Sequence, residues 1–357
     1  MMLSAVYSEH FDPYQACIPG EPAKLFPGVT RVVAPNPGVM TGPGTNSYII
    51  GSDELVVVDP GPELAEHVHL LADIGEGRIS KIAVTHKHLD HAPAAALLAR
   101  LTGAETAGFT RSPGFEPDRL LANGDILSVQ GAELQAIYTP GHSSDHLCYM
   151  LVGENLLFTG DHLMQGSTVV VAPLDGDMAK YMDSLRLLLE ITPPARALLP
   201  GHGMWMDDPA RIVSSVIEHR QMREEVVWEA LCRLSKTPQA TRLSLDKDGD
   251  QGGRLSRRPD ESGDQDKSTD GDRQHHPHRG LQVVPGSERE SIDDDRRQGI
   301  SIDDMITTVY RDVPESLHSI ARYSLWAHLR KMTQEGRVCA ADMNGMSTLW
   351  WPAGLSC

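Results

Sequence analysis

The fold of this chain is decided by a stretch with four metal-binding side chains within six residues, Thr85-His86-Lys87-His88-Leu89-Asp90-His91. The ligands stand in the order His-x-His-x-Asp-His, directly after the apolar run 82–84, which is typical of a buried strand. A single strand end cannot direct four ligands to one point, but a turn can divide them into two sets. The stretch therefore predicts two metal ions at the edge of a sheet, an arrangement that commonly performs hydrolysis.

Three later segments supply the partners that these ligands need. Each follows an apolar run and places a His or Asp beside a glycine, which permits a tight turn: Thr139-Pro140-Gly141-His142, Thr159-Gly160-Asp161-His162 and Pro200-Gly201-His202-Gly203. The combined set of five His and two Asp is enough for two metal ions with one bridging carboxylate. Neutral imidazole and carboxylate suit zinc, and also iron or manganese.

The first two hundred residues alternate strand-like and helix-like stretches. The patterns predict strands at 47–50, 55–58, 82–84, 134–138, 148–152, 156–158 and 197–199. They predict helices at 63–75, 92–102, 181–189 and 212–234. Sheets with helices outside them indicate an α/β sandwich, with the candidate ligands on loops at one edge.

The composition changes after this region. Residues 235–300 are rich in Asp, Arg, Gly, Ser and Gln, which predicts a disordered polar linker between a catalytic domain at 1–234 and a domain at 301–357. Ser301 and Asp304 form a plausible capping box for a helix that starts at Ile302. A second helix and a hairpin at 338–351 follow, so the last domain resembles a small winged-helix domain.

These segments, in this order, resemble the metallo-β-lactamase superfamily over residues 25–230. The resemblance implies an αββα sandwich. It also implies seven metal ligands, three for the first metal, three for the second and one that bridges both: His86, His88 and His142; Asp90, His91 and His202; and Asp161.

The resemblance further implies a hydrolase that cleaves an ester, thioester or related acyl bond with water activated by two zinc ions. Asp90 would also orient the nucleophile. Asp59 matches an aspartate of the family that orients the site without binding metal. His146 and His162 match no ligand position, so we expect them to support the ligands from outside.

Two other activities stay open. The winged-helix tail resembles that of a β-lactamase-like group that includes an endoribonuclease, so single-stranded RNA is the alternative to a small acyl substrate such as that of glyoxalase II. A persulfide dioxygenase with one iron is the minor alternative. His88 argues against the di-iron members, which place Glu there. The long linker before the tail departs from that group.

The bulk properties limit partners and location. The net charge of −17 argues against strong non-specific binding of nucleic acid. No apolar run is long enough for a membrane span, and the first residues do not resemble a signal peptide, so we expect a cytoplasmic protein without a membrane partner. A winged helix is also a common dimer module, so the C-terminal domain could mediate oligomerisation.

Overall fold

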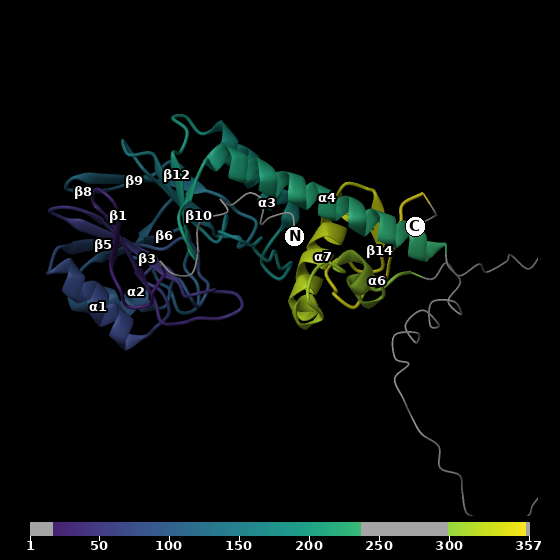
Figure 1. Ribbon diagram of the computed structural model, residues 1–357, viewed down its shortest axis with the longest axis horizontal. Coiled ribbons are helices and arrows are strands. Elements are labelled where there is room, and N and C mark those ends of the chain that lie inside the picture. The colour runs from purple at the N-terminus through teal and green to yellow at the C-terminus, as the bar shows by residue number, and fades with distance from the viewer. Residues whose placement is uncertain (1–16, 237–298, 355–357) are drawn as a thin grey trace, which may run out of the picture. The chain divides into compact units, whose positions relative to one another are not determined.

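Two β-sheets pack face to face in the computed structural model, which describes residues 17–236 and 299–354 (Figure 1). The first sheet has seven strands in chain order: β1 (Ala23–Phe26), β2 (Val29–Val33), β3 (Asn46–Gly51), β4 (Leu55–Val58), β5 (Ile79–Ala83), β6 (Glu105–Gly108) and β7 (Arg119–Leu120). The second sheet has six, in the spatial order β13 (Met206–Asp207), β12 (Ala197–Pro200), β11 (Leu156–Gly160), β10 (Leu147–Leu151), β9 (Ala132–Tyr138) and β8 (Ile126–Val129).

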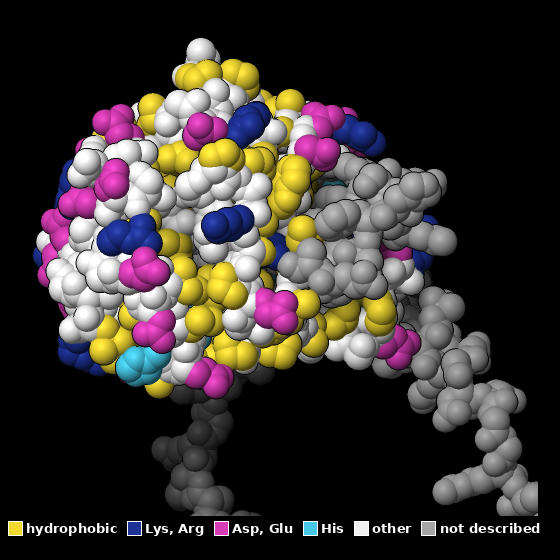
Figure 2. All heavy atoms as spheres, turned by 60° about the vertical axis from the view of Figure 1, so that its left-hand side comes forward, with side chains coloured by type: hydrophobic (Ala, Val, Ile, Leu, Met, Phe, Trp, Pro, Cys, Tyr) yellow, Lys and Arg dark blue, Asp and Glu magenta, His cyan; other side chains and the backbone are white. Residues whose placement is uncertain are grey.

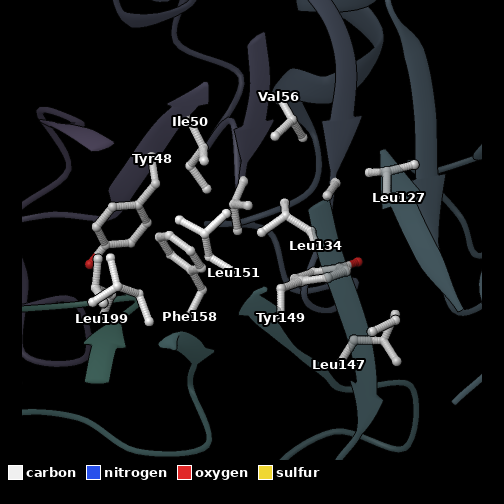
Figure 3. Packing of buried hydrophobic residues seen from close by; sticks show 14 of the residues in the cluster. Tyr48, Ile50, Val56, Leu127, Leu134, Leu147, Tyr149, Leu151, Phe158 and Leu199 are labelled. Atoms are coloured by element: carbon white, nitrogen blue, oxygen red, sulfur yellow. The ribbon is translucent and has the colours of Figure 1, made fainter. Parts of the chain in front are cut away.

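Apolar side chains from both sheets form the central core (Figure 3). Tyr48 and Ile50 on β3 and Val56 on β4 face the second sheet, and the ring of Tyr48 meets the edge of Phe158 on β11 at 5.0 Å. All four residues of β4 are buried because its other face is covered as well. This explains why the strand reads as a continuous apolar run and does not alternate.

Helices cover the outer face of each sheet. The outer side of the first sheet packs on α1 (Ala65–Gly75) and α2 (Ala94–Thr102). The outer side of the second sheet packs on α3 (Met178–Glu190) and on the first half of α4 (Pro209–Ser235). The result is the predicted αββα sandwich.

The C-terminal residues form the predicted winged-helix-like fold: α6 (Ile302–Val309), η2 (Glu315–Leu317), α7 (His318–Gln334), β14 (Val338–Ala340) and β15 (Trp350–Pro352). The capping box of Ser301 and Asp304 is present. This part packs on the second half of α4 through a shared core that includes Leu231 and Trp350. Within the described ranges, no helix is both long enough and apolar enough to cross a membrane.

The predicted linker lies almost wholly outside the described residues, since 237–298 are not described. At its two ends, Ser235 closes α4 and Ile300 bridges Trp350. The described residues through Ser235 and those from Gly299 on belong to one compact unit.

Candidate metal centre

One edge of the sandwich gathers the candidate ligands because each follows the carboxyl end of a strand. The loop after β5 carries residues 86–91, and the loops after β9, β11 and β12 carry His142, Asp161 and His202. Strands β4 and β5 run parallel, as do β11 and β12, so these strand ends meet at the same edge. The seven predicted ligands form two groups whose ligand atoms, within each group, lie within 4.8 Å of one another.

The first group consists of His86, His88 and His142. The Nε2 atoms of His86 and His142 lie 2.9 and 3.0 Å from Nδ1 of His88. Nδ1 of His142 lies 2.8 Å from the carbonyl oxygen of Val170, which can only accept a hydrogen bond. Nδ1 of His142 must therefore carry the proton, and its Nε2 presents a lone pair to the group.

The second group consists of Asp90, His91, Asp161 and His202. Oδ1 of Asp161 lies 3.3 Å from Nε2 of both His91 and His202. These three buried atoms have no hydrogen-bond partner. Oδ2 of Asp161 lies 3.6 Å from Nε2 of His142, so this carboxylate directs one oxygen to each group. Buried polar atoms left in this state point to an absent partner, and a metal cation is the partner that this donor set fits.

The two groups differ in charge. Burial lowers the pKa of His86 well below its usual value, so the first group offers neutral imidazole. Burial also lowers the pKa of His202, but the carboxylates of Asp161 and Asp90 outweigh that effect and raise it to about 9. The second group therefore attracts positive charge. Both properties fit a pair of divalent cations.

Asp59 supports both groups from outside. It is 2% exposed, and its Oδ1 accepts a hydrogen bond from the backbone N–H of Thr85 at 2.7 Å. Its Oδ2 accepts from the Thr85 hydroxyl at 2.8 Å and lies 2.8 Å from Nδ1 of His91. The same hydroxyl lies 2.9 Å from Nδ1 of His86. Asp59 thus reaches one histidine of each group, His91 directly and His86 through the Thr85 hydroxyl.

His146 and His162 stand behind the ligands. Nε2 of His146 accepts a hydrogen bond from the backbone N–H of Asp161 at 3.2 Å, and its Nδ1 lies 2.9 Å from the Thr139 hydroxyl. The carbonyl of His162 accepts a hydrogen bond from the Tyr181 hydroxyl at 2.9 Å. The ring of His162 lies 5.8 Å from that of His146, and neither of its nitrogens has a hydrogen-bond partner.

The sequence did not reveal a charged network beside the first group. Nζ of Lys87 lies 2.9 Å from Oδ1 of Asp175, and the backbone N–H of Lys87 donates to Asp145 at 3.1 Å. The Ser143 hydroxyl donates to Asp175 at 2.8 Å and also to Asp145. These residues come from three loops that are far apart in the chain, so no local motif joins them. The hydroxyl of Ser143 donates to carboxylates and is not activated as a nucleophile.

Comparisons with known proteins agree with this geometry. Residues 40–111 and 108–202 match the family model described as the Metallo-beta-lactamase superfamily, and residues 301–345 match the Beta-lactamase associated winged helix domain. An atrochrysone carboxyl ACP thioesterase of Aspergillus fumigatus is 35% identical over 219 residues, which cover 59% of this chain and 67% of that protein. Lactamase-like protein nscB of the same species is 30% identical over 235 residues, which cover 64% and 69%.

Two solved structures show the same fold. A metallo-beta-lactamase family protein from Thermus thermophilus has a TM-score of 0.62 and 17% identity, and the match covers 92% of this chain and 100% of that one. A beta-lactamase domain protein from Burkholderia ambifaria has a TM-score of 0.65 and 15% identity, with 94% and 95% covered. Both matches extend over the sandwich and the C-terminal domain together.

Proposed function

This chain belongs to the metallo-beta-lactamase superfamily and is a hydrolase of that fold, and from that premise we propose that it cleaves the thioester of an acyl group carried on an acyl carrier protein. The observation that carries hydrolysis is the pair of ligand groups with Asp161 between them. The thioester is supported by relatives named as ACP thioesterases, which are 35% and 29% identical to this chain.

In this proposal, His86, His88 and His142 would hold the first zinc ion, Asp90, His91 and His202 would hold the second, and Asp161 would serve both. Three neutral imidazoles are a set that zinc prefers, and iron or manganese would bind more weakly to the same atoms. Zinc as the resident metal and a cytoplasmic location are parts of the same proposal.

Zinc ions bound there would supply a hydroxide near neutral pH and positive charge for the oxyanion that forms at the carbonyl carbon. Asp90 has the most exposed side chain of the second group, at 27%, so its carboxylate can accept a hydrogen bond from the attacking water. Asp59 keeps Nδ1 of His91 protonated, which leaves Nε2 of that ring free to bind.

The leaving group favours a thioester over other acyl bonds. A thiol has a pKa of about 8.5, so the thiolate leaves without a proton from a general acid. An amide nitrogen or a ribose oxygen needs such a proton. With metal ions bound, the site would supply activated water and positive charge, and these are sufficient for a thioester.

The test is release of thiol from an acyl thioester of an acyl carrier protein and from S-lactoylglutathione, measured with a thiol reagent on protein loaded with zinc. Asp161→Ala removes the bridging carboxylate, and Asp73→Ala changes an exposed carboxylate on α1 as the matched control. We expect cleavage by the wild type and by Asp73→Ala, no cleavage by Asp161→Ala, and about two zinc ions per wild-type chain. Equal activity in Asp161→Ala would show that the site is assigned wrongly.

The alternatives are tested in the same assay. Single-stranded RNA is disfavoured by the net charge of −17 and, on the face shown in Figure 2, by basic side chains that lie singly among acidic and apolar ones. Cleavage of RNA without release of thiol would replace the thioesterase proposal. Oxygen uptake with glutathione persulfide by the iron-loaded protein would favour the dioxygenase.

A further inference from the structure

A polar cavity lies between α3, α4 and α7, and none of the metal-ligand candidates lines it. It has a volume of about 270 Å³. Met182 and Arg186 line it from α3, Arg220 and Glu224 from α4, and His328 and Lys331 from α7, with Gln221 and Glu225 also at its wall. A water molecule needs about 30 Å³, so the cavity has room for a small ion with several waters.

Arg220 is the unusual member of this cavity. Its side chain is buried, at 3% exposure, and no carboxylate of the described residues pairs with it. Its guanidinium donates to the carbonyl of Val169 and lies 5.2 Å from the centre of the Tyr181 ring, while its Nε has no hydrogen-bond partner. Burying a charge without a counter-ion costs free energy of folding, so a bound anion would stabilise this guanidinium.

The two carboxylates at the wall are already neutralised. Glu224 pairs with Nζ of Lys331 at 2.8 Å and with Arg337, and Glu225 lies 3.6 Å from Arg337. They therefore leave the charge of Arg220 uncompensated. Arg186, whose half-exposed side chain pairs with the exposed Asp183 at 2.7 Å, adds a second guanidinium at the mouth of the cavity.

His328 supplies a second unmet donor. It is 1% exposed, and neither ring nitrogen has a hydrogen-bond partner. Its Nδ1 is 3.9 Å from the nearest oxygen of Glu224, which is beyond hydrogen-bond distance. Burial lowers the pKa of this ring, so it is neutral near pH 7 and offers one N–H to a ligand.

We propose that this cavity binds a phosphate group, held by the guanidinium of Arg220 and the ring of His328, with Arg186 at its mouth. A guanidinium forms strong hydrogen bonds with phosphate oxygens, and Nε of Arg220 has a buried N–H without a partner to offer. None of these residues belongs to the two ligand groups, so phosphate binding here can be tested separately from the proposed thioesterase activity.

Phosphate at this position would also stabilise the metal centre. Arg220 holds the carbonyl of Val169, and the next carbonyl along the chain, that of Val170, orients His142. A guanidinium fixed by phosphate would keep this loop in place. The cavity is therefore placed to couple phosphate binding to the geometry of the first ligand group.

The test is calorimetric titration of the zinc-loaded protein with inorganic phosphate. We expect saturable binding of one phosphate per chain, and we expect Arg220→Lys and Arg186→Ala each to weaken it by roughly tenfold or more. Arg186→Ala keeps the test valid if the buried variant does not fold. Arg196→Ala is the matched control, since Arg196 is exposed and pairs with Glu154, and its affinity should equal that of the wild type.

Phosphate also binds metal centres, so Asp161→Ala is titrated as well. Binding that survives in Asp161→Ala supports the cavity. Binding that is lost in Asp161→Ala but kept in Arg220→Lys and Arg186→Ala would overturn the proposal, as would no saturable binding up to about 10 mM. Glycerol 3-phosphate distinguishes the source: tighter binding than inorganic phosphate indicates a phosphate ester, and weaker binding indicates the free ion.

Discussion

Replacing Asp59 by Asn changes no volume but removes an acceptor that two histidines depend on. The amide oxygen can keep the bond to the backbone N–H of Thr85, which is 2.7 Å in the native protein. The amide N–H₂ then faces Nδ1 of His91, where the native carboxylate lies at 2.8 Å. Two donors cannot share this contact. Either the ring moves its proton to Nε2, which points at the second ligand group, or a buried donor is left unpaired.

The cost follows from these contacts. An unsatisfied buried donor costs about 1–3 kcal/mol, and losing the outer partner of a metal-binding His weakens metal affinity by roughly 10- to 100-fold. We expect a loss in this range at the second site. The first site should lose less, because His86 is reached only through the Thr85 hydroxyl, at 2.9 Å.

The assay is competition for zinc with a fluorescent chelator, which gives both binding constants. Asp53→Asn is the matched control, because Asp53 is an exposed carboxylate on the turn between β3 and β4. If Asp59→Asn binds both zinc ions as tightly as the wild type and Asp53→Asn do, the reasoning is refuted. A thermal melt of the metal-free variants shows whether the fold itself is affected.

Burial raises the pKa of Glu224, but the nearby ring of His328 and the ammonium of Lys331, both on α7, outweigh this and lower it to about 2. The carboxylate therefore stabilises the fold above its unfolded pKa of 4.5, and roughly 3 kcal/mol are lost as the pH falls from about 4.5 toward about 2. Urea denaturation should show a smaller acid dependence in Glu224→Gln. Arg330→Met removes a hydrogen bond of 2.8 Å from α7 to the carbonyl of Pro173. We expect a severalfold higher KM for the thioester and faster hydrogen exchange in residues 163–177, because the loop loses this support. An unchanged KM would count against the importance of this contact. A Cβ on Gly201 would lie 2.7 Å from Cε1 of His91, so Gly201→Ala should lower zinc content in elemental analysis.

Much of the fold could be predicted from local patterns. The strand 55–58 was predicted with its observed bounds, because an apolar run between turn residues is a strong local signal. The capping box at Ser301 is equally local. The strands β1, β2 and β6 were not predicted. They are only four or five residues long, and no residue of β1 is fully buried, so they become strands only through pairing with neighbours.

The ligand groups could be predicted because four ligands follow one strand end in a single run, and the other three each follow a further strand end directly beside a glycine. The surrounding network could not. Asp175 meets Lys87 across 88 residues of chain, and Arg220 meets the carbonyl of Val169 across 51. Contacts of this kind depend on how loops and helices pack, and neither segment carries a sequence motif that identifies its partner.

These distant contacts suggest what the C-terminal domain does for the metal centre. The loop 163–177 carries the carbonyl of Val170 that orients His142. Two arginines hold that loop from outside, Arg220 on α4 and Arg330 on α7. Since α7 belongs to the winged-helix-like part, its packing on α4 fixes a ligand that lies in the sandwich. We therefore expect this domain to affect catalysis through the loop, without touching substrate, which the higher KM predicted for Arg330→Met would support.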